Sequence, residues 1–370
     1  MALLRMPSTA AELGRSMEGN MEITKYRVGI IGLGSMGTRY LETLNASDRW
    51  EVVSACDLNE ERLDWAAELI PGVETTRDTR SITNNPDIDV VGIFTLADIR
   101  PQLIKESLSQ KRHVMAEKPI AASVAEEKEL LRTIEASDRI VAVNLFNRNA
   151  WYHEEIQSFI RQGQIGDLAV LDISHQTSGL MPTEGHQPEG PPFHDCGMHY
   201  VDVARWYAGS EYDKWHAQGL RMWSWKDPWW VNAHGHFRNG VVFNITQGFT
   251  YGQLAEKKVV RCGLEAIGTK GVVRMQHDFD TVRIEFHGVT HTETKEGPYG
   301  GYGGKKLDVM CQRFAEALDS GDSSLLPNSR DSVIASEVSQ AMLDASSRDG
   351  APCIGTPEDM AEILAHRNES

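Results

Sequence analysis

The sequence predicts two structural parts: an N-terminal doubly wound parallel α/β sheet, followed by an open, mainly antiparallel sheet flanked by helices in an α+β arrangement. The chain has 370 residues, more than one hydrophobic core usually organises. Short apolar runs alternate with helical segments from Tyr26 to about Asn147, a pattern typical of βαβ units. Beyond residue 150, strand-like segments follow one another across short turns such as Arg238-Asn239-Gly240, which favours antiparallel pairing.

The periodicity of apolar residues assigns the elements in order. In the first part, strands are predicted at 28–31, 52–56, 88–94, 113–116 and 140–146, and helices at 38–45, 101–110 and 124–137. The second part begins with a predicted helix at 151–162 and ends with helices at 306–318 and 331–347. Between them, strands are predicted at 169–176, 215–223, 231–237, 241–249, 258–267, 271–275 and 282–286. We therefore divide the chain into an arm (1–25), a first domain (26–147) and a second domain (148–370).

Composition excludes several classes of partner. The formal net charge is -16 and no block of Lys or Arg occurs, so the chain repels phosphate backbones and anionic lipids. We expect neither a nucleic-acid nor a membrane partner. The five cysteines are scattered without a CxxC pair, which fits reduced thiols, and no apolar stretch matches a signal peptide or a membrane span. These features predict a cytoplasmic protein.

A glycine-rich loop between the first predicted strand and the next helix indicates a Rossmann-type dinucleotide site. The motif runs Gly32-Leu33-Gly34-Ser35-Met36-Gly37. Its glycines allow a tight turn and bring a diphosphate close to the N-terminus of the helix. Asp57 ends the next strand, where a carboxylate accepts from ribose hydroxyls and repels a 2′-phosphate, so we expect NAD rather than NADP. The alternative is a plain glycine turn followed by a solvated aspartate.

Two further motifs carry groups suited to proton transfer and charge stabilisation. Glu117-Lys118-Pro119 ends a predicted strand, where open α/β sheets bind ligands. The run Asp195-Cys196-Gly197-Met198-His199-Tyr200-Val201-Asp202 puts Asp195 and His199 at i and i+4 if 195–206 is one helix, about 5–6 Å apart at Cβ. The alternatives are a solvated lysine, a structural helix pair, and a metal site that includes His194. We expect no metal, because zinc usually recruits three shaped ligands and hard cations need more carboxylates.

With both motifs in order beside the glycine loop, the chain resembles the Gfo/Idh/MocA family, the glucose–fructose oxidoreductase and inositol dehydrogenase group. That family carries E-K-P in a Rossmann domain and D-x-G-x-H-x-x-D in an open-sheet domain, and every named position is filled here over about residues 26–351. The resemblance implies that the catalytic residues are Lys118, Asp195 and His199. It implies cofactor contacts from Gly32, Gly34, Ser35, Met36, Gly37, Asp57, Thr95, Glu117 and Lys118. It implies substrate contacts from Lys118, Asn147, Arg148, Asp195 and His199.

The chain departs from the family pattern after its fourth strand. Family members commonly have T-P-x-x-x-H at this point, and here the sequence is Thr95-Leu96-Ala97-Asp98-Ile99-Arg100. The missing proline and histidine change the contacts near the nicotinamide ribose. We expect Arg100 to replace the imidazole there as a hydrogen-bond donor.

The resemblance implies an NAD-dependent oxidoreductase acting between a secondary hydroxyl and a ketone of a sugar, sugar derivative or cyclitol. His199 would remove the hydroxyl proton with its orientation and pKa set by Asp195, and Lys118 would stabilise the alkoxide. A redox-neutral NAD-dependent glycosidase of the same family is an alternative. A non-catalytic NAD-binding regulator is another, although the intact Lys118 and His199 argue against it.

An aromatic cluster in the second domain predicts a covered surface. It comprises four tryptophans and two histidines, the latter on one face of a predicted strand: Trp223, Trp225, Trp229, Trp230, His234 and His236. We expect a core or an interface between subunits of a homodimer or homotetramer, and the alternative is a platform on which a sugar stacks. The glycine-rich stretch 297–304 predicts a mobile loop, placed over the site.

Overall fold

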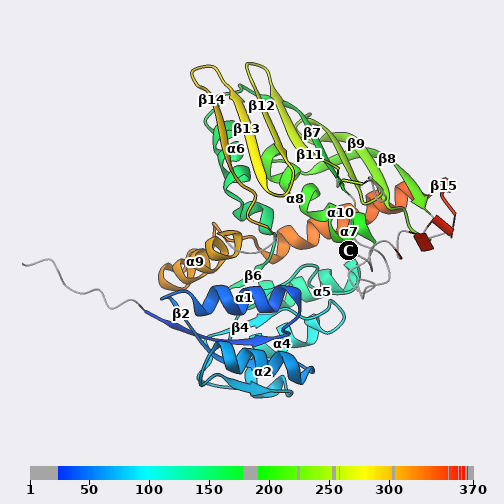
Figure 1. The fold of residues 1–370 in the computed structure, drawn as a ribbon. Coiled ribbons are helices and arrows are strands. Elements are labelled where there is room, and N and C mark those ends of the chain that lie inside the picture. Colours follow the sequence, from blue (N-terminus) through cyan, green and yellow to red (C-terminus); the bar gives the residue numbers. More distant parts are fainter. Residues whose placement is uncertain are drawn as a thin grey trace, which may run out of the picture.

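The protein is built from two sheets with helices between them. A computed structural model describes residues 24–177, 191–222, 226–251, 256–257, 259–301, 305–348, 350–356, 358–359, 361–362 and 365. All but the last two residues of the predicted N-terminal arm lie outside these ranges. Figure 1 shows the first sheet and the second sheet as separate layers, with helices α9 (Lys305–Ser320) and α10 (Ser329–Ser347) lying between them.

The first domain contains a six-stranded, fully parallel sheet. Its strands are β1 (Tyr26–Ile31), β2 (Trp50–Cys56), β3 (Glu74–Thr76), β4 (Val90–Ile93), β5 (His113–Ala116) and β6 (Val141–Val143). The connecting helices are α1 (Ser35–Asn45), α2 (Glu60–Leu69), α3 (Arg80–Thr83), α4 (Arg100–Ser109) and α5 (Val124–Glu135). The strand order β3-β2-β1-β4-β5-β6 reverses direction between β1 and β4, which confirms the doubly wound prediction. The loops that follow these parallel strands therefore meet at one edge of the sheet.

The second domain contains a nine-stranded sheet in the order β14-β13-β12-β11-β7-β10-β9-β8-β15. Its strands are β7 (Leu168–Thr177), β8 (Tyr212–Met222), β9 (Trp230–Phe237), β10 (Val242–Gly248), β11 (Val260–Gly268), β12 (Val272–His277), β13 (Thr281–His287), β14 (Thr292–Pro298) and β15 (Cys353–Ile354). Only the β7–β10 and β8–β15 pairs are parallel, so the prediction of a mainly antiparallel sheet is confirmed.

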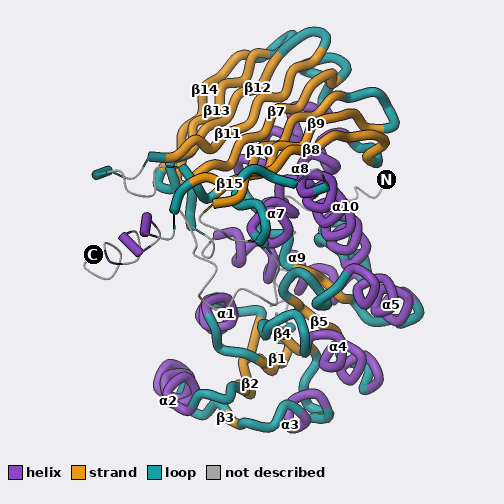
Figure 2. The backbone as a smooth tube through the Cα atoms, turned by 90° about the vertical axis from the view of Figure 1, so that its right-hand side faces the viewer, coloured by secondary structure: helices purple, strands orange, loops and turns teal. Residues whose placement is uncertain are grey.

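Helices cover one face of this second sheet and leave the other open (Figures 1 and 2). The covering helices are α6 (Trp151–Arg161), α7 (Pro192–Asp195), α8 (Gly197–Ala208) and α10. Burial alternates along strands such as β13, because successive side chains point to the helices and to the open face. The predicted glycine loop at 297–304 starts inside β14, and its residues 302–304 lie outside the described part.

Helix α9 belongs to the hydrophobic core of the first domain although it follows the second sheet in the chain. Its buried side chains Leu307, Met310 and Phe314 join that core, and the Phe314 ring lies 6.1 Å from the ring of Trp50 on β2. Val333 of α10 packs in the core on the other face of the first sheet. The division that we propose at 147/148 therefore separates the two sheets, and α9 and α10 bring them together.

Candidate active site

The loop between β1 and α1 forms a cradle that is open to an anionic ligand. A Cβ on Gly32 (φ +91) would lie 2.8 Å from the backbone just after β4, and one on Gly37 would lie 1.8 Å from the Gly32 carbonyl oxygen. At Gly34, by contrast, a Cβ would have no heavy atom within 4 Å, and no side chain caps α1 in the described structure. The backbone amides of the first turn, which contains Ser35 and Met36, can therefore receive an anion, and this cradle fits the diphosphate of NAD.

Asp57 lies beside this cradle at the end of β2. Its carboxylate accepts hydrogen bonds from the backbone N–H groups of Leu33, at 2.7 Å, and Asn59, at 2.8 Å. The guanidinium of Arg62 approaches the same carboxylate at 3.6 Å. Because the glycine loop itself donates to Asp57, the carboxylate lies next to the ligand cradle, as the sequence predicts for a ribose contact.

Arg100 does not lie where the sequence analysis expects it. The residue is buried, and its guanidinium donates to the carbonyl oxygens of Thr95 and, at 2.6 Å, of Pro119. The expectation of a donor near the nicotinamide ribose is wrong, because these two backbone carbonyls take up the guanidinium. Arg100 instead ties the loop after β4 to the loop after β5. Thr95 itself stays at the cofactor edge, where it packs beside Gly32.

Lys118 and Asp195 form an ion pair between the two domains. The Lys118 ammonium donates to the Asp195 carboxylate and, at 3.1 Å, to the Asp195 backbone carbonyl. Both side chains are only 12% exposed, so water screens their attraction less than at the surface. Glu117, next to Lys118, is buried and accepts from the Asn144 side chain at 2.6 Å, which anchors the turn. The structure thus brings two of the three predicted catalytic residues into contact.

The single helix over 195–206 that the i, i+4 spacing of Asp195 and His199 assumes is interrupted in the structure. A continuous helix would need the Asp195 carbonyl to accept from the His199 N–H, but that carbonyl accepts from Lys118. The His199 N–H donates instead to the Cys196 carbonyl at 3.2 Å. Helix α7 therefore ends at Asp195, and α8 begins two residues later. Asp195 holds Lys118, and no described hydrogen bond joins it to His199, so the prediction that it orients the imidazole is not met.

His199 is a buried, uncharged imidazole. Its ring lies 4.2 Å from the ring of Phe146, centroid to centroid. Burial lowers the pKa of His199 well below its usual value, and the positive charges of Lys118 and Lys306 lower it further. Within the described structure, no group hydrogen-bonds to its Nδ1. A neutral ring held in this way can accept a proton from a bound hydroxyl.

The structure does not bring Arg148 into the predicted substrate site. Its guanidinium binds the carboxylates of Asp202, at 2.5 Å, and Asp331, at 2.9 Å, and so links the turn η1 (Phe146–Asn149) to α8 and α10. Asp202, the last residue of the second motif, is therefore a structural partner of Arg148. Neighbouring Asn147 is buried, and its side-chain nitrogen has no described partner, so it is still available as a substrate contact.

Three residues that the sequence analysis did not single out form a cluster, which Lys306 links to His199 through the Phe146 ring. Tyr299 follows β14, His277 ends β12 and Lys306 lies in the first turn of α9. The Tyr299 and His277 rings are stacked 4.4 Å apart, and the Lys306 Nζ lies 3.9 Å from the Tyr299 ring centroid. The predicted glycine-rich stretch contains Tyr299 and was the only signal for this part of the site. The sequence around Lys306 reads as a solvated helix start.

The predicted aromatic cluster is divided in the structure. Two of its members lie outside the described residues: Trp223 and Trp225. Trp229 is buried. Trp230, His234 and His236 share one face of β9, because they alternate with Val231 and Ala233, which are buried. The prediction of two histidines on one strand face is therefore confirmed. The open face around them is mainly polar.

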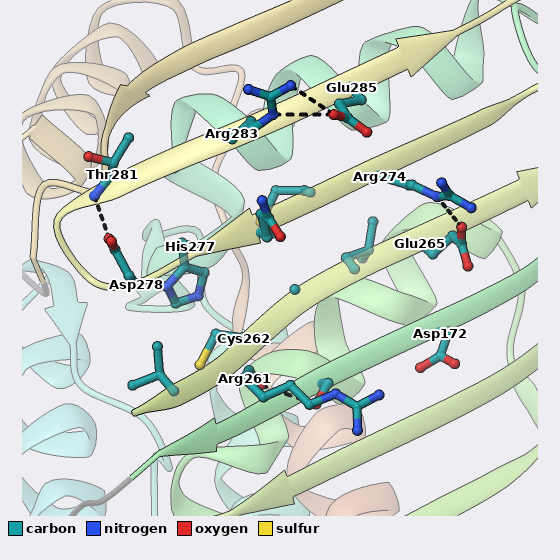
Figure 3. A pocket seen from close by; sticks show the side chains of 16 residues that line it. Asp172, Arg261, Cys262, Glu265, Arg274, His277, Asp278, Thr281, Arg283 and Glu285 are labelled. Atoms are coloured by element: carbon teal, nitrogen blue, oxygen red, sulfur yellow. Dashed lines mark hydrogen bonds and ion pairs between the residues drawn. The ribbon is translucent and has the colours of Figure 1, made fainter. Parts of the chain in front are cut away.

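A wide hollow of about 800 Å³ lies on this open face, and His277 lies at its edge (Figure 3). It is lined by charged pairs, among them Arg274 with Glu265 at 2.5 Å and Arg283 with Glu285 at 2.9 Å. The sheet separates it from α8, which carries His199. In the part of the chain that the structure describes, no three His, Cys, Asp or Glu side chains gather as a metal site. No helix of that part has the length and apolar character of a membrane span.

Comparison with family models matches both domains. Residues 26–145 match the model of an oxidoreductase family with an NAD-binding Rossmann fold, and residues 153–274 match the Gfo/Idh/MocA C-terminal domain. Together the two matches cover more than half of the chain.

Curated relatives and solved structures agree with these matches. The chain is 25% identical over 193 residues to myo-inositol 2-dehydrogenase of Thermotoga maritima. The matched region covers 52% of this chain and 58% of that relative. The chain is 23% identical over 269 residues to inositol 2-dehydrogenase of Rubrobacter xylanophilus, with 70% and 73% covered. The chain thus spans little more than half the length of the first of these relatives. A scyllo-inositol dehydrogenase of Lactobacillus casei, solved with NAD(H) and scyllo-inositol, has the same fold, with a TM-score of 0.72, 20% identity, and 88% and 98% covered.

Proposed function

Because this chain belongs to the Gfo/Idh/MocA family of NAD-binding oxidoreductases, we propose that it oxidises a secondary hydroxyl of a sugar, sugar derivative or cyclitol, or reduces the corresponding ketone. The observation that carries the proposal is the contact between Lys118 and Asp195. It joins the cofactor edge of the first domain to the helix pair that holds His199. A cation and a neutral imidazole from different domains then face the place where a substrate would meet the cofactor.

The cofactor would rest on residues of the first domain. The cradle at Gly34 would receive its diphosphate, Asp57 its ribose, and Thr95 would line the path towards Lys118. When bound, NAD supplies the nicotinamide carbon that takes up the hydride.

The residues of the chain would handle the proton and the charge on the substrate oxygen. His199, which burial keeps neutral, accepts the hydroxyl proton. Lys118 would stabilise the negative charge that develops on the same oxygen. Asp195 acts as a positioning residue, because it fixes the Lys118 ammonium through two contacts.

The names of the relatives suggest the first substrates to test, since several are inositol 2-dehydrogenases. Purified protein is mixed with NAD and, in turn, with myo-inositol, scyllo-inositol, aldoses and glycosides, while the absorbance of NADH is followed. We expect His199→Asn to lower turnover by about 100-fold or more and to leave NAD binding unchanged. His216→Asn, which alters an exposed histidine on β8, is the matched control and keeps full turnover.

The outcomes of this screen distinguish the alternatives. Consumption of a glycoside without accumulation of NADH would indicate the redox-neutral glycosidase. Tight NAD binding without turnover of any compound would indicate the regulator, and the assembled Lys118, Asp195 and His199 favour the enzyme over it. Turnover that survives His199→Asn would refute the assigned base.

We also propose that the protein forms a homodimer or homotetramer through the open face of the second sheet. In the described structure no helix covers this face (Figures 1 and 2), and the same face of a second copy of the chain can cover it in a symmetric oligomer. Light scattering at micromolar concentration tests this proposal. A monomer would contradict it.

A further inference from the structure

Lys306 is a buried lysine in an aromatic enclosure. The residue is 3% exposed, although it stands in the first turn of α9, whose first residue, Lys305, is exposed. The ammonium donates to the Gly301 carbonyl at 2.9 Å and lies 3.9 Å from the centroid of the Tyr299 ring. Further aromatic contacts come from the rings of Tyr152, at 5.3 Å, and Phe146, at 5.4 Å.

The described surroundings of Lys306 are a carbonyl oxygen and aromatic rings. Two other buried cations of the site region are paired, Lys118 with Asp195 and Arg148 with Asp202. In the described structure no carboxylate forms an ion pair with Lys306, and burial lowers its pKa to about 7. Burying an ammonium without an anion is costly, and the carbonyl and the ring faces offset that cost only partly.

Lys306 lies in the same enclosure as the proposed base. The Phe146 ring lies beside both residues: its centroid is 4.2 Å from the centroid of the His199 ring and 5.4 Å from the Lys306 Nζ. The positive charge of Lys306 lowers the pKa of His199 and of His277, so it is electrostatically coupled to both imidazoles. The charges of Lys118 and Lys306 therefore both act on His199. Asp195 neutralises Lys118, whereas Lys306 has no such partner among the described residues.

We propose that Lys306 is a specificity-determining residue that binds a carboxylate on the substrate, so that the substrate is an acidic sugar or cyclitol derivative. This inference rests on the proposed function and names the substrate class of the same site. One buried ammonium beside aromatic walls suits a singly charged carboxylate attached to an apolar ring face. A phosphate dianion would need more donors than Lys306 provides. The net charge of -16 opposes an anion at long range, but salt screens exposed charges beyond roughly 8 Å, and the contact at Lys306 is local.

The test compares sugars that differ only in the carboxylate. D-glucose and D-glucuronate, and D-galactose and D-galacturonate, are titrated onto the protein with saturating NAD, and binding is measured by calorimetry alongside turnover. We expect the wild type to bind at least one acid about 10- to 100-fold more tightly than its neutral partner, the range for one charge-assisted hydrogen bond. Lys306→Met should remove this preference by weakening the acid and should leave the neutral sugar within about threefold.

Two controls keep the result interpretable. Lys305→Met removes the exposed neighbouring charge and should leave the preference unchanged. Lys306→Met should melt no lower than the wild type, because it replaces an unbalanced buried charge with an apolar chain of similar length. Should it fail to fold, Lys306→Arg tests the same contact with the charge retained.

The outcomes separate this inference from the proposed function. Equal or weaker binding of both acids by the wild type overturns the carboxylate site, whether or not turnover occurs. A preference that survives in Lys306→Met also overturns it. Acid binding through Lys306 without oxidation of any sugar or cyclitol would refute the proposed function and leave the anion site standing.

Discussion

Gly34→Ala should separate cofactor binding from folding. Gly34 has φ -70 and ψ -167, a conformation that alanine adopts, and its Cβ would meet no heavy atom within 4 Å. We therefore expect the unfolding free energy of the cofactor-free protein to stay unchanged or rise by up to about 1 kcal/mol, because alanine restricts the unfolded chain. The added methyl group projects from the N-terminus of α1 into the cradle. Loss of one charge-assisted hydrogen bond to the diphosphate corresponds to about 1.5–3 kcal/mol, or roughly 10- to 100-fold weaker NAD binding.

The assay is denaturant unfolding with and without NAD. At an NAD concentration of 100 times the wild-type Kd, NAD should stabilise the wild type by about 2.7 kcal/mol. If the Kd of Gly34→Ala is 100-fold weaker, the same NAD concentration should stabilise the variant by only about 0.4 kcal/mol. Calorimetric titration with NAD gives the Kd values independently.

Gly37→Ala provides the contrast. Its Cβ would lie 1.8 Å from the Gly32 carbonyl oxygen, so the loop must move, and we expect the cofactor-free protein to lose about 1–3 kcal/mol or more. Wild-type NAD affinity in Gly34→Ala would refute the assignment of the cradle. A large loss of stability in Gly34→Ala without NAD would refute the reading of Gly34 as open to ligand.

Three further predictions address the site and the stability of the fold. Lys118→Ala should lower turnover by about 100-fold. In the double variant with His199→Asn, the total loss of turnover should be smaller than the product of the two single losses, and full additivity would show that the two groups do not act together. Asp57→Ala should weaken NAD binding and improve NADP binding in titrations, because it removes the ribose acceptor and releases Arg62, 3.6 Å away, for a phosphate; unchanged discrimination would contradict this. Burial lowers the pKa of His113 from 6.5 to about 4. Between these two pH values the unfolded state binds a proton that the folded state does not. The free energy of unfolding therefore falls by up to about 1.4 kcal/mol per pH unit as the pH is lowered from 6.5 to about 4. His113→Asn should flatten this slope in urea unfolding at pH 7 and pH 5, and an unchanged slope would refute the assignment.

Local sequence was sufficient to bring the residues of the proposed cofactor half of the site to one edge of the first sheet. The glycine loop, Asp57 and Thr95 each follow a buried strand directly, and parallel strands bring their ends to one edge. Apolar periodicity identifies such strands without knowledge of distant contacts. Strand β3 escaped detection because it is only three residues long and partly exposed.

Contacts between distant residues account for the errors. Lys118 is 77 residues from Asp195 in the chain, and it donates a hydrogen bond to the backbone carbonyl oxygen of Asp195. The spacing of residues within 195–206 gives no sign of this contact. Arg148 donates hydrogen bonds to Asp202 and Asp331, which are 54 and 183 residues away in the chain. Because these two carboxylates hold its guanidinium, Arg148 does not reach the predicted substrate site. A lysine at a helix start is usually solvated, so the burial of Lys306 follows only from the way α9 enters the first domain.

The charges around His199 suggest how substrate binding and proton transfer are coupled. In the protein alone, burial and the two lysines lower the pKa of His199 well below its usual value, which makes the imidazole a weak base. Asp195 compensates Lys118, but in the described structure Lys306 has no such partner. A substrate carboxylate on Lys306 would cancel the second positive charge and raise the pKa of His199 towards the range in which a base works best. A neutral compound would leave that charge in place. The acidic substrate that fits the enclosure would thus also strengthen the base that acts on it, so the preference for it should appear in kcat as well as in KM.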